Sequence, residues 1–169
     1  YYFNIVGKYG PQVQAVLKKA ANLEIQQICP LHGPILKENI SRALELYQIW
    51  SSYEPETEGV FIAYASLHGN TGKGAQRLAE ILKEKGCQEV VVMDLARRDS
   101  SEAVECAFRY GKIVLAAASY NAGVVPFMED FLHHLKAKTY RNRKVALIEN
   151  GSWAPSAAKT MRAVLDEMK

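Results

Sequence analysis

The sequence lacks the features of membrane, secreted and disulfide-rich proteins. No stretch approaches the roughly 20 continuous apolar residues of a membrane-spanning helix, so no membrane partner is expected. The opening residues, Tyr1-Tyr2-Phe3-Asn4-Ile5, have neither the basic start nor the small-residue cleavage site of a secretory signal. There are 3 cysteines and no Cys-x-x-Cys pair, which excludes a disulfide framework and favours a reducing cytoplasm. An initiating methionine is also missing, so we expect a fragment or a processed form of a longer protein.

The sequence has no strong excess of positive or negative charge. The net charge is +3, and neither a basic stripe interleaved with aromatics nor a helix-turn-helix pattern is present, so no nucleic-acid partner is expected. Two basic clusters, Arg97-Arg98 and Arg141-Asn142-Arg143-Lys144, are interpreted as solvated edges between elements. His133 and His134 are adjacent and lack the i, i+3 or i, i+4 spacing of a helical metal pair, so no ligand role is expected for them.

From residue 60 onward, apolar runs alternate with amphipathic stretches at a regular spacing. Residues 60–65 are continuously apolar, as expected of a strand buried on both faces of a parallel sheet. The alternation predicts right-handed βαβ units and a doubly wound α/β sheet. Ser100 or Ser101 is the expected cap of the second helix. We predict strands at 60–65, 90–93, 113–118 and 145–148, and helices at 72–85, 101–110, 126–136 and 157–168.

The first part of the chain has a different pattern. Residues 53–59 are polar and acidic and contain Pro55 and Gly59, which is typical of a linker. Before them the spacing predicts helices at 12–21 and 38–50, with a short apolar run and a turn between them. Two helices and at most one strand offer a poor core. We therefore predict an appendage at 1–52, a linker at 53–59 and an α/β domain at 60–169.

The loop after the first predicted strand has the composition of a phosphate site. In such sheets, ligands bind beyond the carboxyl ends of the strands. Ser66, Asn70 and Thr71 offer hydroxyl and amide groups, and the next helix offers free N–H groups and a favourable dipole. Ordinary helix caps use the same residue types. The pattern of a P-loop is not met, because Lys73 is followed by Gly74, and no dinucleotide fingerprint is present, so the phosphate would belong to a mononucleotide.

Two further loops follow the third and fourth predicted strands. Residues 119–123 read Ser-Tyr-Asn-Ala-Gly, and residues 149–153 read Glu-Asn-Gly-Ser-Trp. Each combines an aromatic residue with small polar residues and glycine. A flat heteroaromatic ring could stack on Tyr120 or Trp153 while loop amides bond its polar edge. One tryptophan after a strand is more often a packing residue, but here all three loops are expected at one sheet edge.

These loops resemble those of the flavodoxin-like domain in flavodiiron proteins, also called A-type flavoproteins. Residues 64–71 resemble the FMN phosphate loop of flavodoxins, and Ser119-Tyr120-Asn121 with Val125-Pro126-Phe127-Met128 resembles the second flavin loop and its helix. The resemblance implies a flavodoxin-like sheet with strand order 2-1-3-4, a missing fifth strand, FMN as cofactor, and electron transfer without a catalytic acid or base. It assigns FMN binding to Ser66, Leu67, His68, Gly69, Asn70, Thr71, Ser119, Tyr120, Asn121, Ala122, Gly123, Asn150, Gly151, Ser152 and Trp153.

The appendage extends the resemblance. Cys29-Pro30-Leu31-His32-Gly33-Pro34, with Tyr47 and Trp50, resembles the end of the family's metallo-β-lactamase-like domain, which directly precedes the flavodoxin domain. The resemblance implies that residues 1–52 are a remnant of that domain. His32 matches its last iron-ligating histidine, but the other ligands of the di-iron centre are absent here. A metal role for His32 is therefore implied only in the intact parent protein.

For the parent protein the resemblance implies an oxidoreductase. FMN would take electrons from a rubredoxin or a flavin/NADH reductase and pass them to the di-iron centre, which reduces oxygen or nitric oxide, in a head-to-tail homodimer. The sequence departs from the family where Ala117-Ala118-Ser119 replaces a frequent Ser-Pro-Thr, and where Glu149 would bring a negative charge near reduced flavin. The alternatives are a flavodoxin-like NAD(P)H or quinone reductase and a flavin-less binding module.

Overall fold

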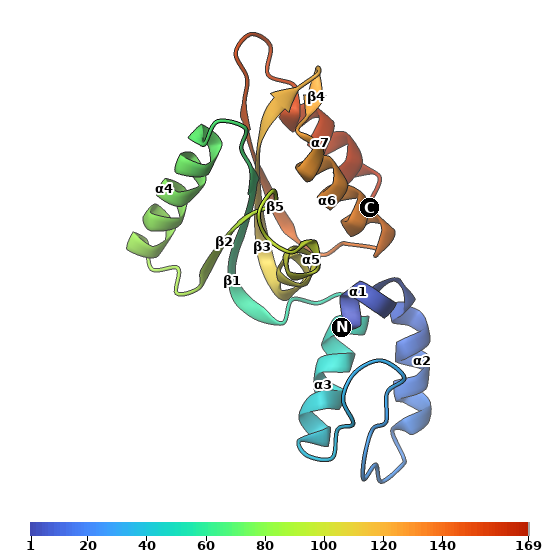
Figure 1. Ribbon diagram of the computed structural model, residues 1–169. Helices are drawn as coiled ribbons and strands as arrows, with labels where there is room; N and C mark the ends of the chain where they lie inside the picture. The colour runs from blue at the N-terminus through green and yellow to red at the C-terminus, as the bar shows by residue number, and fades with distance from the viewer. Residues whose placement is uncertain (169) are drawn as a thin grey trace.

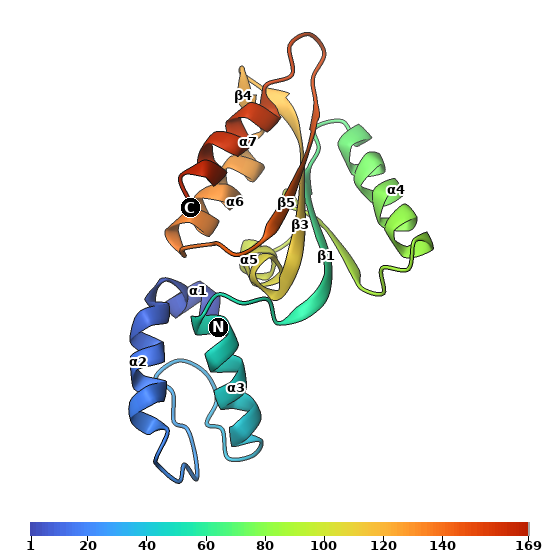
Figure 2. The ribbon, with the colours of Figure 1, turned by 180° about the vertical axis from the view of Figure 1, so that it is seen from behind.

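The computed structural model describes residues 1–168 and shows a sheet flanked by helices, with a smaller helical unit beyond one end of the sheet (Figure 1). The strands are β1 (Thr57–Ala65), β2 (Val90–Asp94), β3 (Tyr110–Tyr120), β4 (Gly123–Val124) and β5 (Lys144–Asn150). The helices are α1 (Tyr2–Val6), the 3₁₀ helix η1 (Gly7–Tyr9), α2 (Gly10–Ala20), α3 (Ile40–Ser51), α4 (Asn70–Glu84), α5 (Ser100–Arg109), α6 (Pro126–Ala137) and α7 (Ala157–Asp166). Helix α4 covers one face of the sheet, and α5, α6 and α7 cover the other (Figure 2).

The sheet has the predicted parallel order. β1 pairs in parallel with β2 and with β3, and β5 pairs in parallel with β3. The parallel strands therefore run β2-β1-β3-β5, which confirms the order 2-1-3-4 for the four predicted strands. β4 is not among the predicted strands; it is antiparallel to the end of β3. Within residues 1–168, no strand follows α7.

Successive residues of β1 and β3 face two separate cores. Phe61 and Leu115 belong to the core beneath α5, α6 and α7, whereas Ile62 and Val114 belong to the core beneath α4. Phe61, Ile62 and Leu115 are 0% exposed. Because side chains alternate between the faces of a strand and both faces are buried here, the strands have continuous apolar runs, as predicted.

Strand β5 is the exception to this two-sided burial. Its apolar run is confirmed as a strand, but it pairs with β3 on one side only, and no strand of residues 1–168 pairs with its other side. Val145 and Ile148 are accordingly 37% and 38% exposed. β5 thus has the composition of an interior strand and the position of an edge strand.

The helices of the α/β part confirm the predicted positions to within a few residues, but the cap of α5 differs. The cap is Asp99 rather than Ser100 or Ser101, because its Oδ1 accepts a hydrogen bond from the N–H of Ser101 at 2.7 Å. Hydrogen bonds from the hydroxyl and N–H of Ser101 lower the pKa of Asp99 below its usual value. None of the helices between residues 1 and 168 combines the length and the apolar composition needed to cross a membrane.

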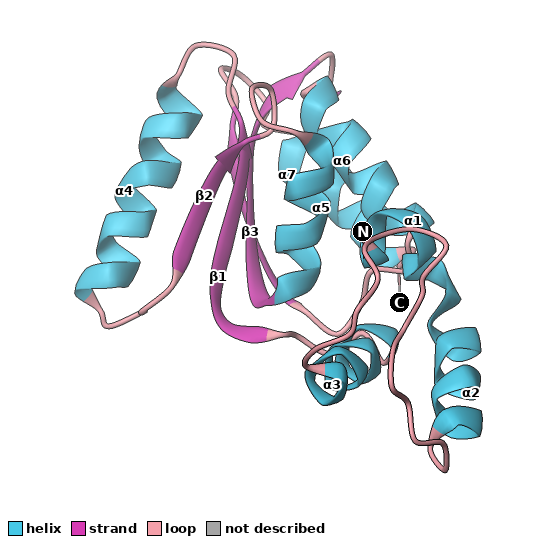
Figure 3. Cartoon of the chain, turned by 60° about the horizontal axis from the view of Figure 1, so that its bottom comes forward, coloured by secondary structure: helices cyan, strands magenta, loops and turns pink. Residues whose placement is uncertain are grey.

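Aromatic contacts fasten the helical unit to the α/β part. Phe3 of α1, a helix that is not among those predicted, stacks on Phe108 of α5 with ring centroids 4.1 Å apart. Tyr53, at the start of the predicted linker, is 1% exposed and donates its hydroxyl to the carbonyl oxygen of Gly7 at 2.9 Å. Figure 3 shows the unit beside the end of the sheet where β1 begins. The division into an appendage, a linker and a domain stays a prediction.

The interpretation of residues 141–144 as a solvated edge is wrong for Arg143. Its guanidinium donates hydrogen bonds to the carbonyl oxygens of Tyr53 at 2.6 Å, of Glu54 at 3.2 Å and of Phe108. Burial lowers the pKa of Arg143 from its usual value. Because the usual pKa of arginine lies far above neutral, the guanidinium stays charged. One cation therefore joins the segment before β1 to the end of α5 and the start of β5.

The turn between β3 and β4 holds its two central residues in the left-handed region. Asn121 has φ 48° and Ala122 has φ 59°. Two positive φ values in a two-residue hairpin define a type I′ turn, which matches the twist of the strands. Asparagine tolerates this conformation, whereas alanine pays about 1–2 kcal/mol for it.

Replacing Arg143 by alanine should remove the donor shared by three carbonyl oxygens and lower the free energy of unfolding by about 3 kcal/mol. Arg141→Ala is the matched control in the same turn, since that guanidinium lies over the ring of Tyr53 at 4.2 Å and should contribute less than about 1 kcal/mol. Urea unfolding followed by circular dichroism measures both. Equal losses in the two variants would contradict the role given to Arg143.

Ala122→Gly should stabilise the fold by about 0.5–1 kcal/mol, because glycine relieves the left-handed strain but loses more chain entropy on folding. Ala163→Gly, at an exposed interior position of α7, should instead destabilise it by about 1 kcal/mol. Thermal unfolding of the two variants beside the parent chain gives the comparison. A loss of stability in both would show that the turn is not strained.

Candidate functional site

The three loops predicted to bind a ligand lie together at one edge of the sheet. They follow β1, β3 and β5, and because these strands are parallel, all three loops leave the sheet at its carboxyl end (Figures 1 and 2). This edge is opposite the end where β1 begins and the helical unit is attached. The parallel topology therefore produces the arrangement that the sequence predicts.

A cavity of about 180 Å³ lies between the three loops. The first loop lines it with Ser66, Leu67, His68, Asn70 and Thr71, and the others with Ser119, Asn150, Gly151 and Ser152. Ala118 also lines it and is not among the predicted residues. Among the predicted residues, Gly69, Tyr120, Asn121, Ala122, Gly123 and Trp153 do not line the cavity.

The start of α4 has unused hydrogen-bonding capacity on the side of this cavity. Gly69 is the N-cap residue, with φ 84°, and none of the described side chains caps the helix. The first N–H groups of α4 are thus left for a ligand or solvent, and the helix dipole favours an anion there. The hydroxyl of Ser66 is buried and has no hydrogen-bond partner among the described residues. Both features fit an oxyanion with several acceptor oxygens.

At the start of α7, by contrast, three successive N–H groups donate to protein side chains. Ser119 Oγ accepts hydrogen bonds from the N–H of Ser156 at 2.8 Å and from that of Ala157 at 3.2 Å. Glu149 Oε2 accepts one from the N–H of Ala158 at 2.9 Å. Of the two helices that begin at this edge beside the cavity, α4 therefore has the open N-terminus.

Two exposed aromatic rings flank the cavity. Tyr120 and Trp153 directly follow the lining residues Ser119 and Ser152, and they are 44% and 99% exposed. Leu67, at the other side, is 48% exposed. Large apolar groups of this kind gathered at one place on a surface mark binding sites. They offer a platform for a flat ring outside the cavity itself.

Tyr64, the last residue but one of β1, supports the first turn of α4. A Cβ atom on Gly72 would lie 3.0 Å from Cε2 of Tyr64, so glycine allows the helix to approach the strand closely. Burial raises the pKa of the Tyr64 phenol, and the nearby Asp94 carboxylate raises it further. The phenol is neutral at physiological pH and leaves the anion-binding character of the helix start unchanged.

The predicted metal ligand lies apart from this site. His32 is exposed in the loop between α2 and α3. Residues 1–168 contain no group of three His, Cys, Asp or Glu side chains placed to hold a metal ion. His134 Nδ1 lies 2.9 Å from the carbonyl oxygen of Asp130 in its own helix. The role of His32 stays an expectation about a longer protein.

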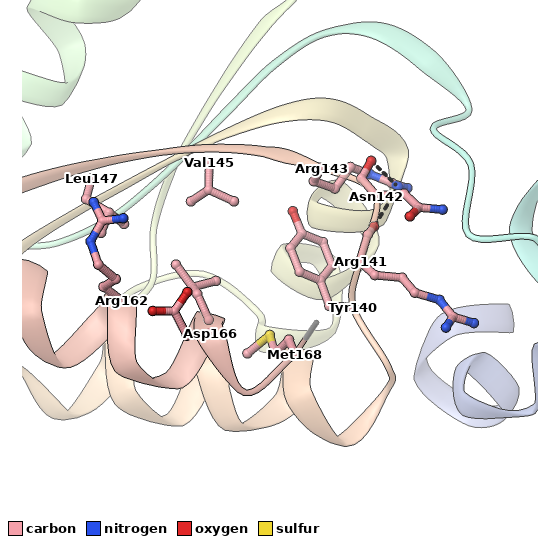
Figure 4. A pocket seen from close by; sticks show the side chains of 10 residues that line it. Tyr140, Arg141, Asn142, Arg143, Val145, Leu147, Arg162, Asp166 and Met168 are labelled. Atoms are coloured by element: carbon pink, nitrogen blue, oxygen red, sulfur yellow. Dashed lines mark hydrogen bonds between the residues drawn. The ribbon is translucent and has the colours of Figure 1, made fainter.

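A larger pocket, of about 410 Å³, lies at the opposite end of β5 and was not predicted (Figure 4). Val145 and Leu147 of β5 form its apolar side, and Arg162 and Asp166 of α7 stand across from them. Tyr140 also lines it, and the buried hydroxyl of this residue has no partner among the described residues. This hollow follows from the unpaired side of β5, and it contains none of the predicted ligand-binding residues.

Comparison with known proteins shows the family of the chain and several of its relatives. The Flavodoxin domain family model matches residues 61–168. The chain is 26% identical to the rubredoxin-oxygen oxidoreductase of Megalodesulfovibrio gigas, over 99% of this chain and 42% of that protein. It is 22% identical to an anaerobic nitric oxide reductase flavorubredoxin of Escherichia coli, over 99% of this chain and 35% of that protein.

A solved structure extends the likeness to the fold. The flavodiiron protein from Giardia intestinalis superposes with a TM-score of 0.90, at 22% identity, over 100% of this chain and 42% of that one. At this identity the likeness shows the fold alone. The chain spans less than half the length of each of these proteins.

Proposed function

Because the chain belongs to the Flavodoxin domain family and is homologous to flavodiiron proteins over nearly its whole length, we propose that it binds FMN at the three loops and transfers electrons through it. When bound, FMN supplies one- or two-electron chemistry. The residues of this chain bind and orient the cofactor, and no side chain acts as a general acid or base.

The open N-terminus of α4 beside the unpartnered hydroxyl of Ser66 is the observation that carries the proposal. A phosphate monoester has several acceptor oxygens and a negative charge, and helix N-termini are established phosphate sites. Ser66, Asn70 and Thr71 line the cavity and would hold the phosphate with the first N–H groups of α4. The lack of a side-chain cap then leaves these groups free for the ligand.

The size of the cavity limits which part of FMN enters it. Pockets that enclose whole drug-sized ligands measure about 300–1,000 Å³, whereas this cavity measures about 180 Å³. It suits the phosphate and part of the ribityl chain. The ring system would lie outside, stacked on Tyr120 or Trp153, with the backbone of residues 150–152 bonding its polar edge.

We extend the proposal to a longer protein on the basis of the relatives' names and lengths. In it, this chain would be part of an oxidoreductase acting on oxygen or nitric oxide, with a rubredoxin or a flavin/NADH reductase as electron donor. Residues 1–52 would adjoin a metal domain, with His32 as one ligand of a di-iron centre, in a cytoplasmic head-to-tail homodimer. The described residues by themselves do not form such a centre.

The fluorescence of FMN should be quenched when it binds to the chain. FMN should bind at least about tenfold tighter than riboflavin, since the phosphate adds charge-assisted hydrogen bonds. Asn70→Ala combined with Thr71→Ala should weaken FMN binding and leave riboflavin binding unchanged. Fluorescence titration of both flavins into both proteins measures the four affinities. A double variant with the affinity of the parent for FMN would refute the phosphate site.

The same titrations and an assay of NADH oxidation separate the alternatives. A folded parent chain that binds neither flavin would favour a flavin-less binding module. Oxidation of NADH by the FMN-loaded chain without an added reductase would instead favour an NAD(P)H or quinone reductase.

Trp153→Ala should reduce the quenching of bound FMN and raise its midpoint potential, because the negative face of the indole no longer opposes the added electrons. Affinity should fall by less than about tenfold, the equivalent of one stacking contact. Trp50→Phe, which alters the other tryptophan in the helical unit, is the control. Spectroelectrochemistry gives the potentials; an unchanged potential in Trp153→Ala would place the ring elsewhere.

A further inference from the structure

The first turn of α7 joins the ends of three strands. Ser119, near the end of β3, accepts hydrogen bonds from the N–H groups of Ser156 and Ala157, at 2.8 and 3.2 Å. Glu149, near the end of β5, accepts one from the N–H of Ala158 at 2.9 Å. Two strands therefore cap the same helix, although their acceptors are far apart in the sequence.

Ser156 is the N-cap residue of α7, but its side chain does not cap the helix. Its hydroxyl instead donates to the carbonyl oxygen of Gly123 in β4 at 3.0 Å. The β3–β4 hairpin, which includes Tyr120, is thereby tied to the residue where the third loop ends. Both loops beside the proposed ring site are held by one helical turn.

The third loop is folded tightly onto this turn. A Cβ atom on Gly151 would lie 3.0 Å from Ser119 Oγ and 3.1 Å from the Cα atom of Pro155. At such distances a side chain on residue 151 would fit only if Ser119 or Pro155 moved by a few tenths of an ångström. The path of residues 150–152, which line the cavity, and of Trp153 after them therefore depends on where Ser119 and α7 lie.

We propose that Glu149 and Ser119 are positioning residues, which hold the loop of Trp153 in a fixed relation to Tyr120 by capping α7. The proposal rests on FMN binding at this edge and adds the device that orders two of its three loops. Glu149 acts here as a hydrogen-bond acceptor of the helix. Its carboxylate is engaged by α7, whereas the sequence alone suggests a charge facing the flavin.

Two neutral substitutions of Glu149 separate these two roles. Glu149→Ala and Glu149→Gln remove the same charge, but only glutamine keeps an oxygen that can accept from the N–H of Ala158. We expect Glu149→Ala to weaken FMN binding about fivefold, the equivalent of about 1 kcal/mol for a lost cap. Glu149→Gln should remain within about twofold of the parent, because the hydrogen bond persists. Ser119→Ala should act in the same direction as Glu149→Ala.

A second readout needs no flavin. In a Trp50→Phe background, the fluorescence anisotropy of Trp153 reports how firmly its loop is held. Glu149→Ala should lower the anisotropy, and Glu149→Gln should restore it. Glu58→Ala is the matched control, since the side chain of Glu58 is 93% exposed and pairs with Lys112 at 3.1 Å near the opposite end of the sheet. Circular dichroism confirms that each variant is folded.

The outcomes decide between the roles. Equal effects of alanine and glutamine in both readouts would assign Glu149 a charge role and overturn the proposal, as would parent-like behaviour of Glu149→Ala. If the parent itself does not bind FMN, the proposed function fails. The anisotropy series then still decides whether Glu149 and Ser119 hold the loop.

Discussion

Phe61 and Ile62 are neighbours in β1, face opposite sides of the sheet, and are both 0% exposed, in two different cores. A strand that buries side chains on both faces needs helices on both sides of the sheet. Crossover connections between parallel strands supply these helices. Parallel strands in turn leave the sheet at the same edge. The convergence of the three loops at one place is therefore a consequence of burying both faces of β1 and β3, before any ligand is considered.

That edge uses two helix starts in different ways. Both α4 and α7 begin there with N–H groups that lack helical partners. At α7 these groups are taken by Ser119 and Glu149, so the helix serves to hold the loops. At α4 none of the described side chains caps the helix, and the hydroxyl of Ser66 nearby has no hydrogen-bond partner within residues 1–168. Of these two helices, α4 is therefore the one whose first N–H groups remain available for the proposed phosphate.

The sequence was sufficient for the strands, their order and the location of the three loops, because each depends on local apolar runs and on the geometry of parallel sheets. It was insufficient where a residue's role depends on a distant partner. Helix α1 is held by Phe3 against Phe108, more than a hundred positions away. The partly buried Arg143 donates a hydrogen bond to the carbonyl oxygen of Tyr53, 90 positions away. The capping of α7 by Ser119 is of the same kind. Ala122 was unpredictable for another reason: alanine carries no signal for the left-handed turn that it occupies.

The one-sided pairing of β5 has a consequence for the behaviour of the chain in concentrated solution. A short apolar strand such as β5, one side of which pairs with no strand of residues 1–168, is a nucleus for intermolecular sheets. In natural sequences, charged residues at the ends of such segments oppose aggregation. Lys144 and Glu149 flank the apolar residues 145–148 in this way. Because the carboxylate of Glu149 already accepts a hydrogen bond from the start of α7, Lys144 is the charge that mainly opposes association at this strand. Solubility should accordingly depend on the positive charge at the entrance of the strand more than on the negative charge at its exit.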